Sequence, residues 1–421
     1  MGLLLTLLYI VVYYLSPPEL FPVLAPYRVQ LIMATLALIA TIVVVLPAGG
    51  YPVRLPQNTL VIGLLGTALF SRLAVFWLGG VLQALFEFGA IIIIFFLLIA
   101  NVITVARLKT VSIFIIGVAI YYSIMGVLST EGYGSQKFLL EQLGAANDYY
   151  YRMRGLGNLN DPNDMAQVFL VAMALLGAFW IPRALVRNLI VIVPLMTLLL
   201  YGISLTKSRG AMLTLVVVIL VWLKPKVNTV TALLLAAGGL FLLTAIKFTG
   251  RSMERDDGRL MAWSAAITMF KSHPLFGVGW NMFTEHHDLT THNSYLLCLA
   301  ELGTVGFFFW MSLVIVTFLQ LNQFIATSRQ HPQMEAALRL ALSIRLALVS
   351  FLVSSWFLSR TYSMTLYILL AMATALILTM QRRFPHVAFK RPVFRRYASL
   401  AFAGQVASLV GAYVMIQARL L

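Results

Sequence analysis

The stretch ALFEFGAIIIIFFLLIANVIT, residues 84–104, decides the class of fold. It contains one charged residue, Glu87, and its apolar residues follow one another without alternation. A helix of about 20 apolar residues crosses a hydrocarbon core roughly 30 Å thick. A membrane barrel would instead need short alternating segments. The stretch therefore predicts a membrane-spanning helix.

The composition extends this prediction to the whole chain. Of 421 residues, 61% are hydrophobic and 10% are charged, whereas a soluble domain carries about 25% charged residues. We predict an all-α polytopic membrane protein, a single membrane domain over residues 1–421 with about twelve transmembrane helices. The expected spans lie near 3–15, 29–47, 59–78, 86–104, 111–128, 165–180, 189–205, 211–223, 229–246, 293–321, 346–358 and 362–380. A further apolar stretch, 398–417, either spans or lies at the interface.

The distribution of Lys and Arg in the short loops predicts the orientation, because cytoplasmic loops are enriched in both. Alternate loops carry such residues, and the basic arm 381–397 follows the twelfth span. This places the N-terminus in the cytoplasm, with the first span retained because no signal-peptide cleavage site follows it. Two longer loops, 129–164 and 247–292, then face outward. The second separates spans nine and ten and is expected to contain amphipathic helices.

The outward-facing set still carries a surplus of cations. It holds or borders thirteen of the thirty Lys and Arg residues, namely Arg28, Arg72, Lys137, Arg152, Arg154, Lys207, Arg209, Lys247, Arg251, Arg255, Arg259, Lys271 and Arg360. One interpretation is snorkelling to lipid head groups and pairing with nearby acids such as Glu254, Asp256 and Asp257. The other is an outer site for a multiply charged anion, since the Arg fork binds phosphate oxygens two at a time.

Three clusters contain the candidate anion ligands. Arg152 and Arg154 precede a helix expected to start near Asp164, where Asp161 and Asp164 are better explained as turn and cap residues than as metal ligands. The turn 205–213 holds Lys207 and Arg209 between two spans, so its cations lie at a fixed depth. In the third cluster, Arg259 opens a helix with Leu260, Trp263, Ala266, Ile267 and Phe270 on one face.

His292 stands apart from the other histidines, because it lies at the start of an apolar helix. If the helix includes it, Gly303 lies about 20° from His292 around the axis, Gly306 about 40° the other way, and Glu301 about 180° away. The small residues would then let this helix seat closely against a neighbouring helix. Asn293 either caps the helix or orients the His292 ring, and we favour the cap. A helix-capping or interfacial histidine is the structural alternative for His292 itself.

A metal site is not expected. His286, His287 and His292 have a suggestive spacing, but surrounding cations oppose metal binding and no carboxylate completes a set. The single cysteine, Cys298, excludes a cysteine-rich metal site. The turn PLFGVGW, 274–280, has no Lys and no following Ser or Thr, so it is no nucleotide phosphate loop.

These motifs together resemble those of the bacterial O-antigen ligase and polymerase superfamily. His292-Asn293, nine residues, Gly303, two residues and Gly306 follow the ligase pattern. The turn Lys207-Ser208-Arg209-Gly210, the run Gly258-Arg259-Leu260 with Trp263, and HPLFGVGWNMF at 273–283 are similar to its other signatures. The resemblance covers residues 200–310 closely and the span layout more loosely.

The resemblance implies an inverting GT-C-type glycosyltransferase of the Gram-negative inner membrane with a periplasmic site. Its donor would be a glycan on undecaprenyl pyrophosphate and its acceptor a sugar hydroxyl of lipid A–core, with no cofactor, metal or ATP. His292 would act as base or orient the acceptor. Arg209 and Arg259 would bind the pyrophosphate, with Arg152, Arg154 and Lys207 as second choices.

Three other functions remain open at this point. A polymerase of O-antigen units and a protein O-oligosaccharyltransferase would use the same chemistry on other acceptors. A transporter of lipid-linked glycans is the alternative from another class. Transporters place charges near the bilayer midplane and show repeated halves, whereas here the cations gather at one face and no repeat is evident.

Overall fold

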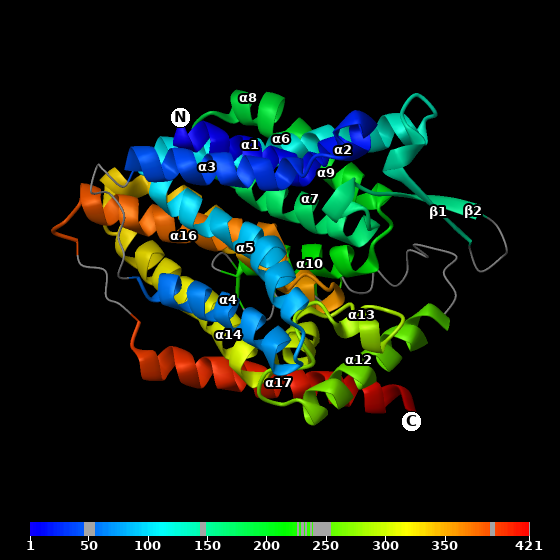
Figure 1. The fold of residues 1–421 in the computed structure, drawn as a ribbon. Helices are drawn as coiled ribbons and strands as arrows, with labels where there is room; N and C mark the ends of the chain where they lie inside the picture. The colour runs from blue at the N-terminus through cyan, green and yellow to red at the C-terminus, as the bar shows by residue number, and fades with distance from the viewer. Residues whose placement is uncertain are drawn as a thin grey trace. The chain divides into compact units, whose positions relative to one another are not determined.

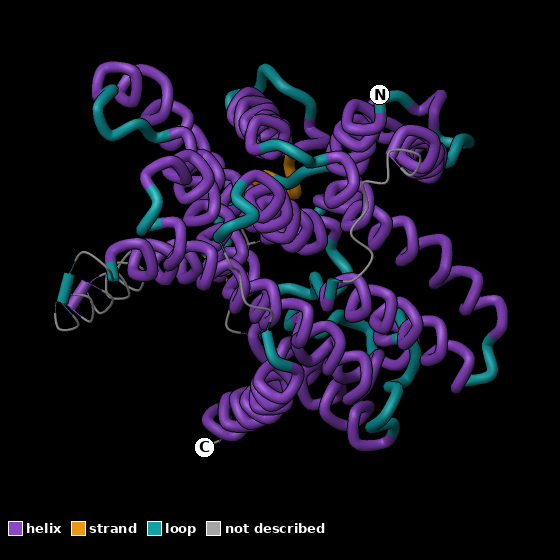
Figure 2. The backbone as a smooth tube through the Cα atoms, turned by 90° about the vertical axis from the view of Figure 1, so that its left-hand side faces the viewer, coloured by secondary structure: helices purple, strands orange, loops and turns teal. Residues whose placement is uncertain are grey.

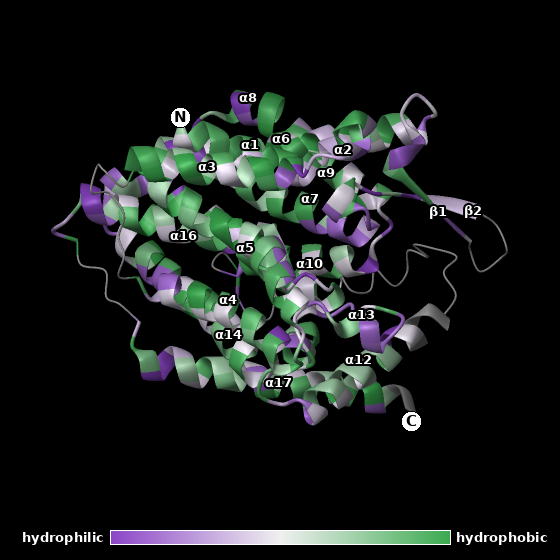
Figure 3. Ribbon diagram, in the orientation of Figure 1, coloured by the Kyte–Doolittle hydropathy of each residue, from purple (hydrophilic) through white to green (hydrophobic). Residues whose placement is uncertain are grey.

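The structure, a computed structural model, describes residues 1–45, 55–143, 149–224, 227–228, 231, 234–235, 238, 254–387 and 392–420 (Figure 1). Helices dominate the described residues, and one short sheet lies among them (Figure 2). Hydrophobic residues follow the long helices, whereas hydrophilic residues gather at helix ends and loops (Figure 3). The predicted all-α polytopic class is confirmed. The chain divides into two compact units, which are described separately.

The first unit comprises Met1–Ala40, Val102–Ser252 and Ser328–Ser354. Its described helices are α1 Gly2–Leu15, α2 Pro17–Leu20, most of α3 Val29–Val45, α6 Val105–Thr130, α7 Pro162–Leu176, α8 Leu185–Arg187, α9 Val193–Leu205, α10 Arg209–Leu223 and α15 Glu335–Ser354. A π-helical turn, Asn188–Ile192, leads into α9. Helix α7 packs against α15 and α9 and is buried along most of its length. It therefore forms the core of this unit, as expected of a helix that is apolar all round.

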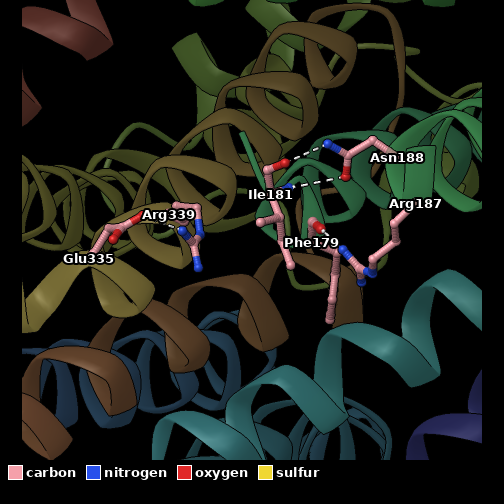
Figure 4. Close-up of polar contacts among 6 residues, drawn as sticks. All are labelled: Phe179, Ile181, Arg187, Asn188, Glu335 and Arg339. Atoms are coloured by element: carbon pink, nitrogen blue, oxygen red, sulfur yellow. Dashed lines mark hydrogen bonds and ion pairs between the residues drawn. The ribbon is translucent and has the colours of Figure 1, made fainter. Parts of the chain in front are cut away.

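Polar contacts close the connection between α7 and α9. The side-chain amide of Asn188 donates to the carbonyl of Ile181 (2.6 Å), and its oxygen accepts from the Ile181 amide (3.2 Å) (Figure 4). Arg187 Nη1 donates to the Phe179 carbonyl (3.0 Å), and Arg339 pairs with Glu335 one turn earlier on α15. Both arginines thus have protein partners. Arg187 lies between the predicted spans 165–180 and 189–205, and Arg339 between 293–321 and 346–358, in loops that are predicted to face the cytoplasm.

The second unit comprises Thr41–Asn101, Met253–Thr327 and Ser355–Leu421. Its helices are α4 Pro56–Ala74, α5 Leu78–Asn101, α12 Glu254–Ser272, α13 Phe283–His286, α14 Ser294–Ser328, α16 Met364–Arg383 and α17 Phe394–Leu420. Helix α16 packs against α5 and is buried over most of its length. It is the central helix of this unit.

Eight of the described helical segments are long and apolar enough to cross a membrane. They are Leu78–Asn101, Val105–Thr130, Pro162–Phe179, Leu185–Leu205, Ser294–Ser328, Pro332–Phe357, Met364–Arg383 and Phe394–Ala418. Three shorter apolar helices, Gly2–Leu15, Val29–Val45 and Arg209–Leu223, correspond to further predicted spans. The C-terminal apolar stretch forms the continuous helix α17, which is long enough to span. The predicted span 229–246 lies largely outside the described residues, so the total of about twelve stays a prediction.

Loop 129–164 contains two short paired strands, which the all-α prediction did not include. Strands β1 Leu139–Leu143 and β2 Tyr149–Met153 pair antiparallel, with Leu139 opposite Met153 and Glu141 opposite Tyr151. Leu139 and Met153 are buried at the base of the hairpin. The tyrosines of β2 favour a strand, because aromatic side chains suit a pleated surface.

Helix α12 buries part of the face that the sequence predicts to be apolar. Trp263 and Ala266 are buried, whereas Met261 is exposed. The indole of Trp263 donates to the Thr291 carbonyl (2.9 Å), and the helix packs against α17. Its apolar face is therefore covered by protein in part. Lys247 and Arg251 of the preceding segment lie outside the described residues.

Candidate functional site

His292 lies just before α14 and not within it. The helix begins at Ser294, and His292 has a left-handed backbone with φ 46°. The helical-wheel argument that placed His292 above Gly303 and Gly306 is therefore wrong, because it assumed continuous helix. Asn293 Oδ1 accepts from the amides of Tyr295 (3.0 Å) and Leu296 (3.1 Å). Asn293 thus caps α14, as N-cap residues do.

A second segment, Leu358–Thr361, holds the backbone of His292 in place. The Ser359 hydroxyl accepts from the His292 amide (2.8 Å) and lies 3.1 Å from the Thr291 hydroxyl. Holding a non-glycine residue in this conformation costs about 1–3 kcal/mol, and such residues cluster at functional sites. In the sequence, this partner appears only as the polar run Ser359-Arg360-Thr361 between two predicted spans.

Ser294 ties the same two segments together. Its hydroxyl donates to the Leu358 carbonyl (2.5 Å) and accepts from the Arg360 amide (2.7 Å). The Thr361 hydroxyl donates to the Ser294 carbonyl (2.6 Å). Thr291, Asn293, Ser294 and Thr361 are all buried, whereas His292 and Arg360 are partly exposed. The buried hydroxyls of Thr291, Ser294 and Thr361 therefore bond to backbone carbonyls of these segments, and His292 and Arg360 reach the surface of the unit.

Gly303 interrupts α14 instead of packing it against a neighbouring helix. Its backbone, φ 62° and ψ −164°, is not helical. A Cβ at this position would lie 2.4 Å from the carbonyl carbon of Leu275. At Gly306, the atoms nearest to an added Cβ belong to Leu302 of the same helix (2.2 Å). The predicted role of Gly303 in helix–helix packing is thus corrected, whereas that of Gly306 stays a prediction.

The turn PLFGVGW pairs with the backbone groups that this interruption frees. The Thr304 amide donates to the Pro274 carbonyl (2.8 Å), and the Val278 amide donates to the Ala300 carbonyl (2.9 Å). Gly277, with φ 68°, approaches so closely that a Cβ would lie 2.2 Å from the carbonyl carbon of Glu301. The glycine-broken turn therefore serves as a backbone partner of α14.

Glu301 contacts residues of α13 and α4 in the second unit. It is buried, and its Oε1 accepts from the Phe283 amide (3.0 Å). It also interacts electrostatically with the buried Arg72, whose guanidinium lies 4.3 Å from the ring centroid of Trp77. Arg72 belongs to the outward surplus of cations, so protein groups compensate this member of the set.

The Lys207–Arg209 turn joins α9 to α10 in the first unit. Helix α9 ends at Leu205, and the Ser208 hydroxyl caps α10 by accepting from the Ala211 amide (3.3 Å). Lys207 has φ 49°, and its ammonium lies 4.8 Å from the ring centroid of Tyr150. Arg209 is the first residue of α10 and is exposed. A helix N-terminus carries partial positive charge, so Arg209 and the helix end both attract an anion.

Arg152 and Arg154 have different surroundings although they are two residues apart. Arg152 is 1% exposed, and its guanidinium donates to the Thr206 carbonyl, Gln142 and Asn163. Arg154 is partly exposed and donates to the Lys137 carbonyl (3.2 Å). The helix after them begins at Pro162 with Asp161 as its cap, two residues before the predicted start near Asp164.

Arg259 and His292 belong to the second unit, whereas Arg152, Arg154, Lys207 and Arg209 belong to the first. Their convergence on one substrate therefore stays a prediction. Arg259 is partly exposed on α12. The side chains of its acidic neighbours Glu254, Asp256 and Asp257 lie outside the described residues. Within the described part of the chain, no group of three His, Cys, Asp or Glu residues is placed to hold a metal ion.

A comparison with protein families places these features in one domain. Residues 194–311 match the family model described as O-Antigen ligase. The match contains the Lys207–Arg209 turn, α12, PLFGVGW and His292 with its cap. No curated protein gives a significant match. Members of this family are ligase- and polymerase-type membrane enzymes related to glycosyltransferases. Residues 194–311 of this multi-pass membrane protein therefore form a domain of the O-antigen ligase family.

Proposed function

We propose that the protein is an O-antigen ligase. It transfers a glycan from undecaprenyl pyrophosphate to a sugar hydroxyl of lipid A–core at the periplasmic face of the Gram-negative inner membrane. The left-handed backbone of His292 carries this proposal, because the Ser359 hydroxyl holds the His292 amide and the buried hydroxyls of Thr291 and Ser294 tie the same two segments together. Observed backbone strain of this kind points to function.

The proposed reaction uses a histidine as the base and arginines as ligands of the leaving pyrophosphate. His292 takes the proton of the acceptor hydroxyl, whose oxygen attacks the anomeric carbon of the donor sugar. The bond between that carbon and the phosphate oxygen breaks, its electron pair stays with the pyrophosphate, and the anomeric configuration inverts. General-base assistance is typically worth about 10²–10⁴ in rate.

The arginines carry the charge that develops on the leaving group. Arg209 and Arg259 bind the pyrophosphate, with Lys207 and Arg154 in support. One well-placed donor in a preorganised site contributes about 3–4 kcal/mol to transition-state stabilisation. The exposed position of Arg209 at the N-terminus of α10 supports this role. Since the donor already carries a pyrophosphate leaving group, the reaction needs no ATP.

The choice of acceptor separates ligase from polymerase. Purified protein in nanodiscs would receive lipid-linked glycan alone, or together with lipid A–core. We expect glycosylated lipid A–core only in the second mixture. Lengthening of the lipid-linked glycan without acceptor would identify a polymerase. Product only on an added protein acceptor would identify a protein O-oligosaccharyltransferase.

His292→Ala in the same assay tests the catalytic assignment. We expect this variant to fold and to lose transfer, and His286→Ala, in an exposed part of the neighbouring loop, serves as the matched control. Near-normal transfer by His292→Ala would reject His292 as the base.

A further inference from the structure

The face of the β-hairpin that carries Tyr150 and Arg152 packs against the Lys207–Arg209 turn. Strand residues two apart share a face, and both contact this turn. Tyr150 lies against the ammonium of Lys207 (4.8 Å), and Arg152 Nε donates to the Thr206 carbonyl (2.8 Å). We propose that Arg152 is a positioning residue, which fixes the turn that presents Lys207 and Arg209 to the donor. The role in donor binding rests on the proposed function.

The guanidinium of Arg152 joins three separate segments of the first unit. Besides Thr206, it reaches Asn163 at the start of α7 through Nη2 (3.1 Å) and Gln142 of β1 through Nη1 (3.5 Å). Only the planar fork of Arg offers donors in several fixed directions at once, whereas a Lys ammonium acts as a compact point charge. The connection therefore depends on the shape of the group as well as on its charge.

The contact with Thr206 also completes the end of α9. The last carbonyls of a helix lack partners within the helix, and a cation near them is favourable. Arg152 supplies that cation, and Ser208 caps α10 two residues later. Lys207 lies between them with a left-handed backbone. The end of α9 and the start of α10 are thus both anchored next to Lys207 and Arg209, the residues predicted to bind the anion.

Burial distinguishes Arg152 from a direct ligand. Its side chain is 1% exposed and three of its N–H groups point at protein acceptors. Arg154, two residues later, is partly exposed. Arg152 therefore acts through the turn, and the earlier prediction that it binds pyrophosphate is replaced by this positioning role.

Hydrogen exchange of the full chain in nanodiscs, without substrate, tests the placement. Arg152→Lys keeps the charge but not the fork. We expect it to speed exchange of the amides around residues 206–211 about tenfold, the effect of losing one charge-assisted hydrogen bond. Arg154→Lys, the matched control, should leave these amides unchanged. Asn163→Ala removes one acceptor and should give a smaller change in the same amides, which keeps the test valid if Arg152→Lys folds poorly.

Kinetics with the lipid-linked donor then test the consequence for the reaction. Arg152→Lys should raise the KM for the donor about tenfold, and adding Asn163→Ala to it should have less than the additive effect. Weaker donor binding with unchanged exchange around 206–211 would make Arg152 a ligand and overturn the proposal. Unchanged exchange and unchanged KM would overturn it as well. Failure of the unmodified protein to transfer glycan would reject the proposed function, while the exchange result would still decide whether Arg152 holds the turn.

Discussion

At the scale of single residues, the role of Asn293 depends on its neighbours in sequence, whereas the conformation of His292 depends on a residue far along the chain. Asn293 caps α14 through its own side chain and the next two amides, an arrangement that depends on neighbours in sequence. The conformation of His292 depends on Ser359, 67 residues away. Local patterns therefore predicted the start of the helix closely, but they gave the wrong conformation for the histidine beside it.

Donor binding should depend on Arg209 and Arg259 individually. Replacing either with Ala removes a charge and a two-pronged hydrogen-bond donor, so we expect the Kd for lipid-linked donor in nanodiscs to rise about 10-fold to 100-fold. Lys271→Ala, at the other end of α12 and exposed, is the matched control. Unaltered donor affinity in both arginine variants would show that they are structural.

At the scale of elements, α14 shows how one glycine changes the course of a helix. The sequence predicted a continuous helix through Gly303, since apolar residues surround it. The structure breaks the helix there, and the turn before α13 supplies hydrogen-bond partners on both sides of the break. The hairpin of loop 129–164 was missed for a related reason. Its pairing joins two short strands whose ladder is visible only once the chain folds back on itself.

Gly303→Ala should destabilise the protein strongly. Its φ and ψ lie in a region open essentially to glycine alone, and the new Cβ would press on the backbone of Leu275. We expect a loss of about 2–4 kcal/mol, measured as a lower thermal unfolding midpoint in detergent. Gly66→Ala, inside α4 with open space around it, is the control and should be neutral or slightly stabilising. Equal midpoints for the two variants would show that the break at Gly303 is not needed.

At the scale of the whole molecule, the candidate anion ligands come from two compact units. The first contributes Lys207 and Arg209, and the second contributes Arg259 and His292. The surplus of outward cations thus has more than one explanation. Arg72 and Arg152 are buried among protein partners, whereas Arg209 is exposed at a helix start. Composition alone does not separate these cases.

Transfer should not require a divalent cation, because fixed arginines and a lysine provide the positive charge that other enzymes take from a metal. We expect the rate of glycan transfer to be unchanged after extensive treatment with EDTA. A loss of activity that Mg²⁺ or Mn²⁺ restores would contradict this prediction and would require carboxylate ligands in the mechanism.

The sequence by itself determined the membrane class, the main apolar helices and the resemblance to the O-antigen ligase superfamily. These features depend on composition, on periodicity and on residue types at short spacing, all of which can be read from neighbouring residues in the sequence. Tertiary structure decided the backbone of His292, the break at Gly303 and the burial of Arg152. Each of these depends on a partner far along the chain: Ser359 for His292, Leu275 for Gly303, and Thr206 for Arg152. A buried polar group needs a hydrogen-bond partner, but only the folded chain shows which distant residue provides it.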